Sequence, residues 1–287
     1  MRWRRRRAVN DAALTNGQDQ SSARWAWGAW GDRGFVATLW VIAGGYAVFL
    51  LLLLATAAWR VEAGSIAAFF ERPELRRAML LSIASVTFSA TVATGLAVPI
   101  GYLLGRRGFR GRGWVEALVD VPIALPPLVI GLLLLIFFRS PAGAWIERAV
   151  GPITYEVPAI VLAQTTIGTA FAARVMRDVF REIPPRAEQI AWTLGCTRRQ
   201  AFTRVSLPEA RRGVVAAWTL AWARSLGEFG PLLVFAGATR MKTEVLSTSV
   251  FLELNVGNIQ GALVASLLIV TLAAAALVAS RWIGGSR

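Results

Sequence analysis

The sequence predicts an all-α membrane protein with six transmembrane helices and both termini on the cytoplasmic side. Three observations support this class. Of the 287 residues, 55% are hydrophobic and 17% are charged, whereas soluble domains average about 25% charged residues. Apolar segments long enough to cross about 30 Å of hydrocarbon recur along the chain. The Lys and Arg residues gather in alternate connections between these segments.

The first element is a basic tail over residues 1–34, which begins "MRWRRRR". A signal peptide would place its apolar region directly after the charges, but here about 25 polar or small residues intervene. We therefore predict a disordered cytoplasmic tail, with the alternative that part of it lies along the anionic membrane surface. The first transmembrane helix follows at 35–59.

The transmembrane domain proper is predicted at 78–282. The fifth predicted span of the chain, 213–238, carries Arg224 and Glu228. Each charge costs roughly 2.5–3.5 kcal/mol at the bilayer centre. Because they lie four residues apart, they share a helix face and are expected to pair. The five spans of this domain are predicted at about 78–105, 117–138, 157–178, 213–238 and 258–280.

The positive charges set the orientation. Of the 31 Lys and Arg residues, 22 lie in the N-terminal tail, around 106–112, in 174–212 and at the C-terminal end. The positive-inside rule places these segments in the cytoplasm. The net charge of +14 is then explained by topology, so we expect no nucleic-acid partner.

Several activities are excluded by composition. There is no histidine, and the single cysteine, Cys196, can form no intrachain disulfide. The single lysine, Lys242, follows Met241, whereas a phosphate-cradling Walker A loop needs Gly before its Lys. We therefore predict no enzymatic activity, no catalytic residue, no metal and no bound cofactor, with any ATP held by a partner subunit.

The loop between the fourth and fifth spans, 181–212, contains "AEQIAWTLGCTRRQAFTRVSLP" (187–208). It is typical of two short helices: Gly195 ends the first, Thr197 caps the second and Pro208 ends or kinks it. Both ends are tied to the bilayer, which favours partner docking or an amphipathic pair in the headgroup zone over a DNA-binding motif. Four residues form the apolar face of the first helix: Ala187, Ile190, Ala191 and Leu194.

This loop resembles the cytoplasmic coupling loop of permease subunits of bacterial ABC importers, whose pattern is E-A-A-x3-G-x9-I-x-L-P. The spacing is complete, although Gln189 replaces the acidic residue and Glu188 precedes it. The resemblance implies a loop that docks into ATPase subunits. The residues that it assigns to coupling are Glu188, Gln189, Ile190, Ala191, Gly195, Val205, Leu207 and Pro208.

Two further segments are similar to molybdate and sulfate permeases: "DVPIALPPLVIGLLLLIFF" (120–138) and "WARSLGEFGPLLVFAG" (222–237). The resemblance implies a type I ABC importer permease fold in the bacterial cytoplasmic (inner) membrane. Implied partners are two ATPase subunits, a second permease copy or a paralogue, and a periplasmic or lipoprotein substrate-binding protein.

Molybdate is the predicted cargo. The alternatives within the class are sulfate, tungstate, phosphate or a polyamine. From other classes, an ion-coupled secondary transporter would carry charged groups at the midplane of several spans. A membrane-anchored interaction protein would leave the loop spacing unexplained.

Transport pathways at membrane depth use broken helices and buried polar groups. Pro and Gly residues gather around residues 122–131 and again around 225–231. Ordinary kinks and close helix packing are the alternative explanation, as is bundle-interior hydrogen bonding for the polar residues of 164–169. The candidate residues of the translocation path or gate are Pro126, Pro127, Thr165, Arg224 and Glu228.

Overall fold

The computed structural model describes residues 33–285, and every regular element in that range is a helix. The chain divides into two units, residues 1–60 and 61–287. The described part of the first unit is a helix, Arg33–Trp59, which matches the first predicted span. The predicted basic tail lies outside the described residues, apart from its last two positions.

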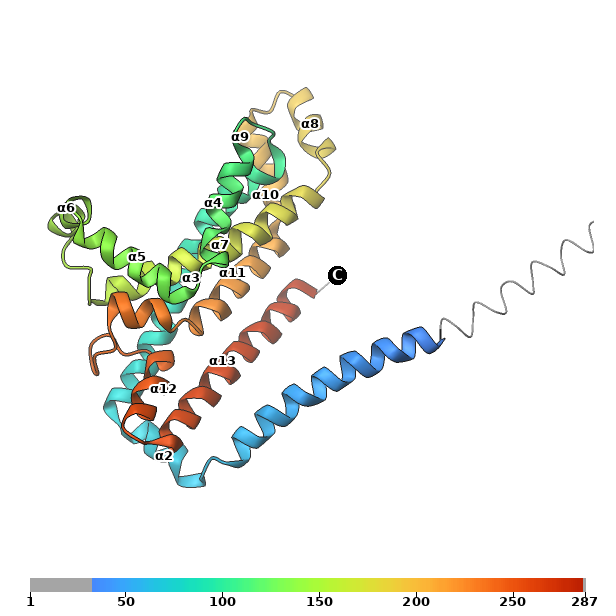
Figure 1. The fold of residues 1–287 in the computed structure, drawn as a ribbon. Helices are drawn as coiled ribbons and strands as arrows, with labels where there is room; N and C mark the ends of the chain where they lie inside the picture. Colours follow the sequence, from blue (N-terminus) through green and yellow to red (C-terminus); the bar gives the residue numbers. More distant parts are fainter. Residues whose placement is uncertain (1–32, 286–287) are drawn as a thin grey trace, which may run out of the picture. The chain divides into compact units, whose positions relative to one another are not determined.

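The second unit begins with α2 and ends with the long helix α13. Figure 1 shows α8 and α9 at one end of this unit and α2 at the opposite end. Two π-helical turns, Phe202–Ser206 and Leu232–Ala236, interrupt the series. The helices are α2 (Ala63–Glu71), α3 (Pro73–Arg106), α4 (Arg112–Ala124), α5 (Pro127–Arg139), α6 (Pro141–Val150), α7 (Val157–Glu182), α8 (Arg186–Thr193), α9 (Arg198–Ala201), α10 (Leu207–Glu209), α11 (Arg211–Leu226), α12 (Leu246–Asn255) and α13 (Ile259–Gly285).

Four helices of the described chain are long and apolar enough to cross a membrane: Arg33–Trp59, α3, α7 and the Ile259–Trp282 part of α13. A fifth crossing is added if α4 and α5 count as one span. The region expected as one continuous third span, 117–138, is therefore divided. Its two helices, α4 and α5, are bent by 111° relative to each other.

The bend between α4 and α5 follows from proline chemistry. Leu125 and Pro126 each precede a proline and have extended ψ angles of 145° and 132°. A residue before proline is pushed out of the helical region, because the proline ring collides with its backbone. Pro127 then begins α5, where a missing N–H does no harm.

The region expected as the fifth span, 213–238, is also divided. The helix α11 ends at Leu226, and helical structure resumes near Pro231 as the π-helical turn Leu232–Ala236. The chain leaves this turn through Gly237, whose φ of 72° is left-handed. Both divided regions coincide with the Pro and Gly clusters of the sequence.

The centre of the second unit is the packing of α3 against α7, with α11 alongside. Small residues let the backbones approach. A Cβ added to Gly101 would lie 2.5 Å from the Cβ of Met176, and one added to Gly105 would lie 2.9 Å from the carbonyl oxygen of Arg177. Such close contact is how helices associate in lipid, where hydrophobic burial gives little driving force.

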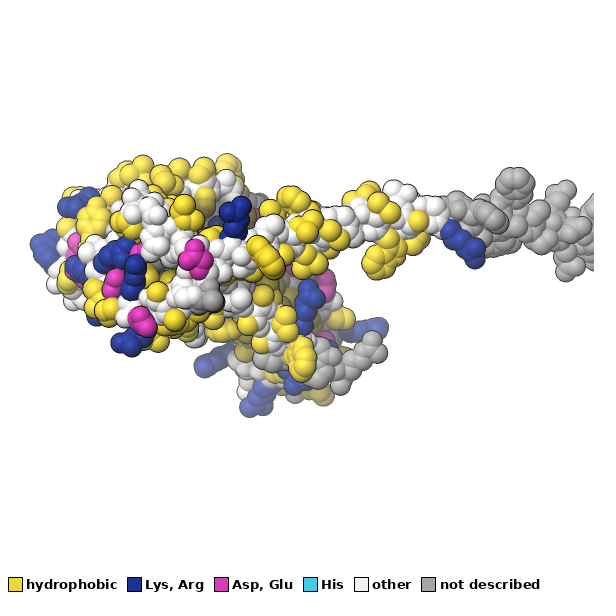
Figure 2. Space-filling model, turned by 90° about the horizontal axis from the view of Figure 1, so that it is seen from below, with side chains coloured by type: hydrophobic (Ala, Val, Ile, Leu, Met, Phe, Trp, Pro, Cys, Tyr) yellow, Lys and Arg dark blue, Asp and Glu magenta, His cyan; other side chains and the backbone are white. Residues whose placement is uncertain are grey.

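Ion pairs fasten the flanking helices to this centre. Arg177 of α7 lies 2.8 Å from Glu116 and 3.4 Å from Asp120, both on α4. At the end where α2 lies, the fully buried Glu253 of α12 pairs with Arg72 at 3.1 Å. Seen from that end, the second unit carries hydrophobic side chains over much of its surface, with charged side chains scattered among them (Figure 2).

Candidate functional site

The loop between α7 and α11 has a sharply defined turn at Gly195. The Gly195 N–H donates to the Trp192 carbonyl and the Cys196 N–H donates to the Ala191 carbonyl, both at 3.0 Å. These two bonds make a Schellman motif, which requires a left-handed residue at the helix end. Gly195 supplies it with φ of 85°. The helix stop expected from the sequence is therefore present.

The next helix, α9, starts with the expected cap. The Gln200 N–H donates to Thr197 Oγ1 at 3.3 Å, and the Thr197 N–H donates to Gln200 Oε1 at 2.8 Å. This reciprocal pair is a capping box, with Gln in place of Glu. Together with Gly195, it fixes the angle at which the two short helices meet.

Pro208, which was expected to end or kink the second short helix, lies in α10, and α10 ends one residue later at Glu209. The π-helical turn Phe202–Ser206 directly precedes this proline. Proline lacks an N–H and collides with the carbonyl four residues earlier in a regular α-helix. The wider turn accommodates the proline locally, so the chain passes into α11 without a long break.

The predicted apolar face of α8 is split between interior and surface. Ala191 is buried and Ala187 is half-buried, whereas Ile190 and Leu194 are 55% and 78% exposed. The helix is attached through Ala191 and Glu188, so its bulkier apolar side chains are left outside. Exposed apolar groups in a cluster are typical of an interaction surface. The exposed residues of α8 and the residue after it are Arg186, Gln189, Ile190, Trp192, Thr193 and Leu194.

Glu188 is turned inward, with 4% of its surface exposed. Its Oε2 accepts a hydrogen bond from the Tyr102 hydroxyl at 3.2 Å, and its Oε1 accepts one from the Ser206 hydroxyl. Arg106 Nε lies 3.5 Å from Oε1. Glu188 thus ties α8 to the end of α3 and to the π-helical turn, while its neighbour Gln189 is exposed.

Arg224 and Glu228 form the ion pair expected from their spacing, with 2.5 Å between Nη1 and Oε1. Glu228 is only 1% exposed. Arg224 also lies over the ring of Phe171 on α7, 5.5 Å from its centroid, which is a cation–π distance. The pair therefore spans the break after α11 and touches α7.

The two divided regions meet each other. A Cβ on Gly131 of α5 would lie 2.6 Å from the Cα of Pro231, and a Cβ on Gly230 would lie 3.0 Å from the Leu128 nitrogen. The segment after Pro126 and Pro127 therefore packs directly on the segment after Glu228. Thr165 of α7 is half-buried, and its hydroxyl has no hydrogen-bond partner among the described residues.

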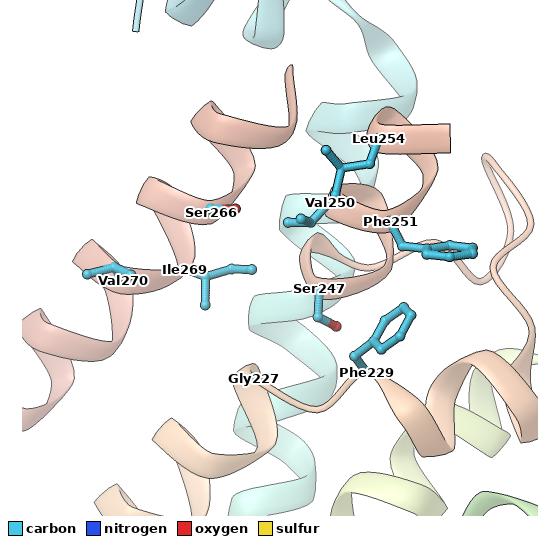
Figure 3. Close-up of a pocket in the computed structure, with 9 residues that line it drawn as sticks. All are labelled: Gly227, Phe229, Ser247, Val250, Phe251, Leu254, Ser266, Ile269 and Val270. Carbon is cyan, nitrogen blue, oxygen red and sulfur yellow. The ribbon is translucent and has the colours of Figure 1, made fainter. Parts of the chain in front are cut away.

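A cavity of about 480 Å³ lies beside the break after α11, between α12 and α13 (Figure 3). Its walls are largely apolar, and Phe229 and Phe251 face each other across 5.4 Å between ring centroids. Ser247 of α12 donates to the Glu228 carbonyl oxygen at 2.6 Å. The backbone of the break is thereby tied to α12.

Sequence reasoning missed the partners of Glu188, namely Tyr102, Arg106 and Ser206. The sequence places Arg106 among the loop charges and Tyr102 within an apolar span. No spacing rule links residues so far apart in the chain. One available signal was that Glu188, an acidic residue in a basic loop, needs a partner if it is buried.

Comparison with known proteins finds a matching family and similar proteins. The family model "Binding-protein-dependent transport system inner membrane component" matches residues 97–284. The sulfate transport system permease protein CysT of Escherichia coli is 34% identical over 72% of this chain and 76% of its own. The molybdenum transport system permease protein ModB of Mycobacterium tuberculosis is 34% identical over 79% of this chain and 86% of its own.

A solved structure shares the fold. It is a bacterial alginate ABC transporter in complex with an alginate pentasaccharide-bound periplasmic protein. One of its chains superposes with a TM-score of 0.68 at 16% identity, covering 88% of this chain and 96% of that chain. At this identity the likeness establishes the fold alone.

Proposed function

Because the chain belongs to the family of binding-protein-dependent transport system inner membrane components, we propose that it carries molybdate through the bacterial cytoplasmic membrane. Members of this family are permease subunits of ABC importers, and ATP hydrolysis occurs on separate ATPase subunits.

One observation carries the mechanism: the α8–α9 loop combines rigid attachment with an exposed apolar surface. The Schellman stop and the capping box fix its shape, and Glu188 fastens it to α3. Its other face presents Ile190, Trp192 and Leu194. A rigid loop tied to membrane helices at both ends transmits a push from a bound ATPase subunit into those helices.

The proposed topology has six spans, with both termini and the coupling loop in the cytoplasm. It counts the four continuous helices, the bent pair α4 and α5, and α11 with its following π-helical turn. Non-helical backbone at membrane depth is tolerated where it is buried in protein or lines a cavity. Both breaks meet that condition, because they pack on each other.

The proposed partners are two ATPase subunits, a second copy of the chain and a periplasmic or lipoprotein binding protein. ATP is bound by the ATPase subunits, with no cofactor on this chain. The solved alginate transporter supports the third partner class, since it was captured with a periplasmic protein. Co-expression with the cognate ATPase gives a direct test: the purified permease brings the ATPase with it, and the Gly195→Glu variant brings much less.

Molybdate and sulfate remain competing cargoes, since relatives named for each are 34% identical. Tungstate shares the same tetrahedral dianionic chemistry. Elemental content distinguishes them: cells with and without the gene are grown at micromolar oxyanion supply, and molybdenum, tungsten and sulfur are measured together. A selective loss of molybdenum supports the proposal. A loss of sulfur moves the cargo to sulfate, and no change in any of the three contradicts the oxyanion class.

A further inference from the structure

A second cavity, of about 340 Å³, lies where the end of α3 meets α8 and α9. Three guanidinium groups line it, those of Arg106, Arg107 and Arg198, against a single carboxylate, that of Glu188. The Glu188 carboxylate already accepts hydrogen bonds from Tyr102 and Ser206. The cavity therefore carries an excess of positive charge.

Arg106 is the unusual member of this set. Its side chain is 92% buried (8% exposed). Its Nε and Nη2 atoms have no hydrogen-bond acceptor among the residues that the structure describes, and its Nε lies 3.5 Å from Glu188. A buried charged donor without an acceptor costs on the order of 1–3 kcal/mol or more. Arg106 thus adds buried positive charge, and the single Glu188 carboxylate does not balance the three arginines, which favours an anion in the cavity.

The position of the cavity favours a docked protein as the source of such an anion. Gln189 and Trp192 line the cavity and are also exposed on the surface of α8. A protein docked on α8 therefore covers the mouth of the cavity and excludes water from it. The helix α3 has 34 residues, or about 51 Å at 1.5 Å per residue, against about 40–45 Å for a bilayer with its headgroups. This length favours a protein over a lipid headgroup as the source.

We propose that this basic cavity receives an acidic side chain of the docked ATPase subunit. The inference rests on the proposed docking role of the loop and adds a specific contact to it. The carboxylate accepts from Arg106 and Arg198, and removal of water by the docked subunit strengthens these bonds. Contact between the two subunits then depends on charge as well as on the apolar side chains of α8.

The test is the affinity of purified permease for its purified cognate ATPase, measured at two salt concentrations. Arg198→Gln is the main variant, because Arg198 is exposed and its loss leaves the Glu188 contacts intact. Arg204→Gln is the matched control, an exposed basic residue of the same loop outside the cavity. We expect at least a tenfold weaker Kd and a smaller salt effect for Arg198→Gln, and less than a twofold change for Arg204→Gln.

Charge reversal identifies the acid. Arg198→Glu is combined in turn with single Asp or Glu to Arg substitutions on the ATPase, and recovery of affinity by one pair supports the proposal. Equal effects of Arg198→Gln, Arg107→Gln and Arg204→Gln would overturn it while leaving docking itself intact. If the permease alone binds sulfate saturably and Arg106→Gln loses this binding, the occupant of the cavity is a free anion and the proposed ATPase side chain is ruled out. Failure of the unmodified proteins to associate would remove the docking proposal and this one together.

Discussion

Glu188 in the α8–α9 loop and Glu228 at the break after α11 are both buried carboxylates beside an arginine, yet they are held in different ways. Glu188, on α8, has partners on two other elements, α3 and the π-helical turn. Glu228 pairs with Arg224, four residues earlier in the same segment. The first carboxylate joins distant parts of the chain, and the second lies across one local break.

The two arrangements differ in what must move to break them. To release Glu188, the whole α8 helix must leave α3, and several buried polar groups lose their partners at once. To separate Arg224 from Glu228, the backbone between them need only turn about the break at Gly227. Local elements with two arrangements are the usual basis of switching. We therefore expect changes at Glu188 to alter the attachment of the loop, and changes at Glu228 to alter transport.

The largest effect is expected at Gly195, on which the geometry of the Glu188 region depends. In Gly195→Glu, a side chain must adopt the left-handed conformation with φ of 85°, at roughly 1–2 kcal/mol, and a charge is added beside the docking face. ATP-driven molybdate uptake into vesicles should be abolished, and the co-purified ATPase should fall by more than tenfold.

Gly195→Asn is the matched control, because asparagine tolerates the left-handed conformation. It should retain most of the uptake and of the bound ATPase. Wild-type uptake in Gly195→Glu would refute the coupling role of the loop.

The next largest effect is expected at Glu228. Glu228→Gln removes the ion pair but keeps the shape of the side chain, so the complex should assemble while uptake slows by at least tenfold. Arg224→Gln should act in the same direction. If the two residues act as one unit, the double variant should be no worse than the more severe single variant. Normal uptake together with normal ATPase stimulation in Glu228→Gln would contradict a gating role.

These two carboxylates also show where sequence reasoning succeeds. The Arg224–Glu228 pair was predictable because helical periodicity alone brings residues four apart together. The stop at Gly195 and the cap at Thr197 were predictable for the same reason, since each motif is complete within a few residues. The contact of Glu188 with Arg106 was not, because it depends on how α3 and α8 pack.

The membrane helices follow the same rule. The prolines around residue 126 predicted a disturbance in the third span, but the bend of 111° between α4 and α5 depends on packing against the second break. Pro208 was expected to end or kink its helix, and the helical path does end one residue after it, at Glu209, but the π-helical turn that precedes this proline has no clear sequence signature. Local chemistry thus gives the positions of breaks, and tertiary packing gives their angles.

A moderate effect is expected for Glu188→Gln. The amide keeps the size of the side chain but loses the ion pair with Arg106 and leaves buried partners poorly matched, at about 1–3 kcal/mol. The loop should open locally, which hydrogen exchange of residues 186–206 would detect, and uptake should fall a few-fold. Gln189→Ala is the control: with an exposed side chain, it should leave the exchange of the loop unchanged. Equal exchange in both variants would show that Glu188 is not a fastening.

The smallest effect is expected at a third carboxylate, Glu147 on α6. Its Oε1 accepts from the backbone N–H groups of Thr154 at 2.7 Å and Ile153 at 3.1 Å. These hydrogen bonds, that of Thr154 first, lower the pKa of Glu147 below its ordinary value of 4.5. A lowered pKa in the folded state means that the contribution of Glu147 to stability is complete above about pH 4.5 and is lost as the pH falls through the lower folded value.

Hydrogen exchange at Ile153 and Thr154, corrected for intrinsic rates, should therefore show protection at neutral pH that declines below pH 4.5. Glu147→Gln should show weaker protection with no such decline, because an amide does not titrate in this range. The effect should stay within the α6–α7 connection and leave ATPase binding unchanged, since Glu147 joins only neighbouring residues. Protection that declines equally in both proteins would show that another group causes the acid sensitivity.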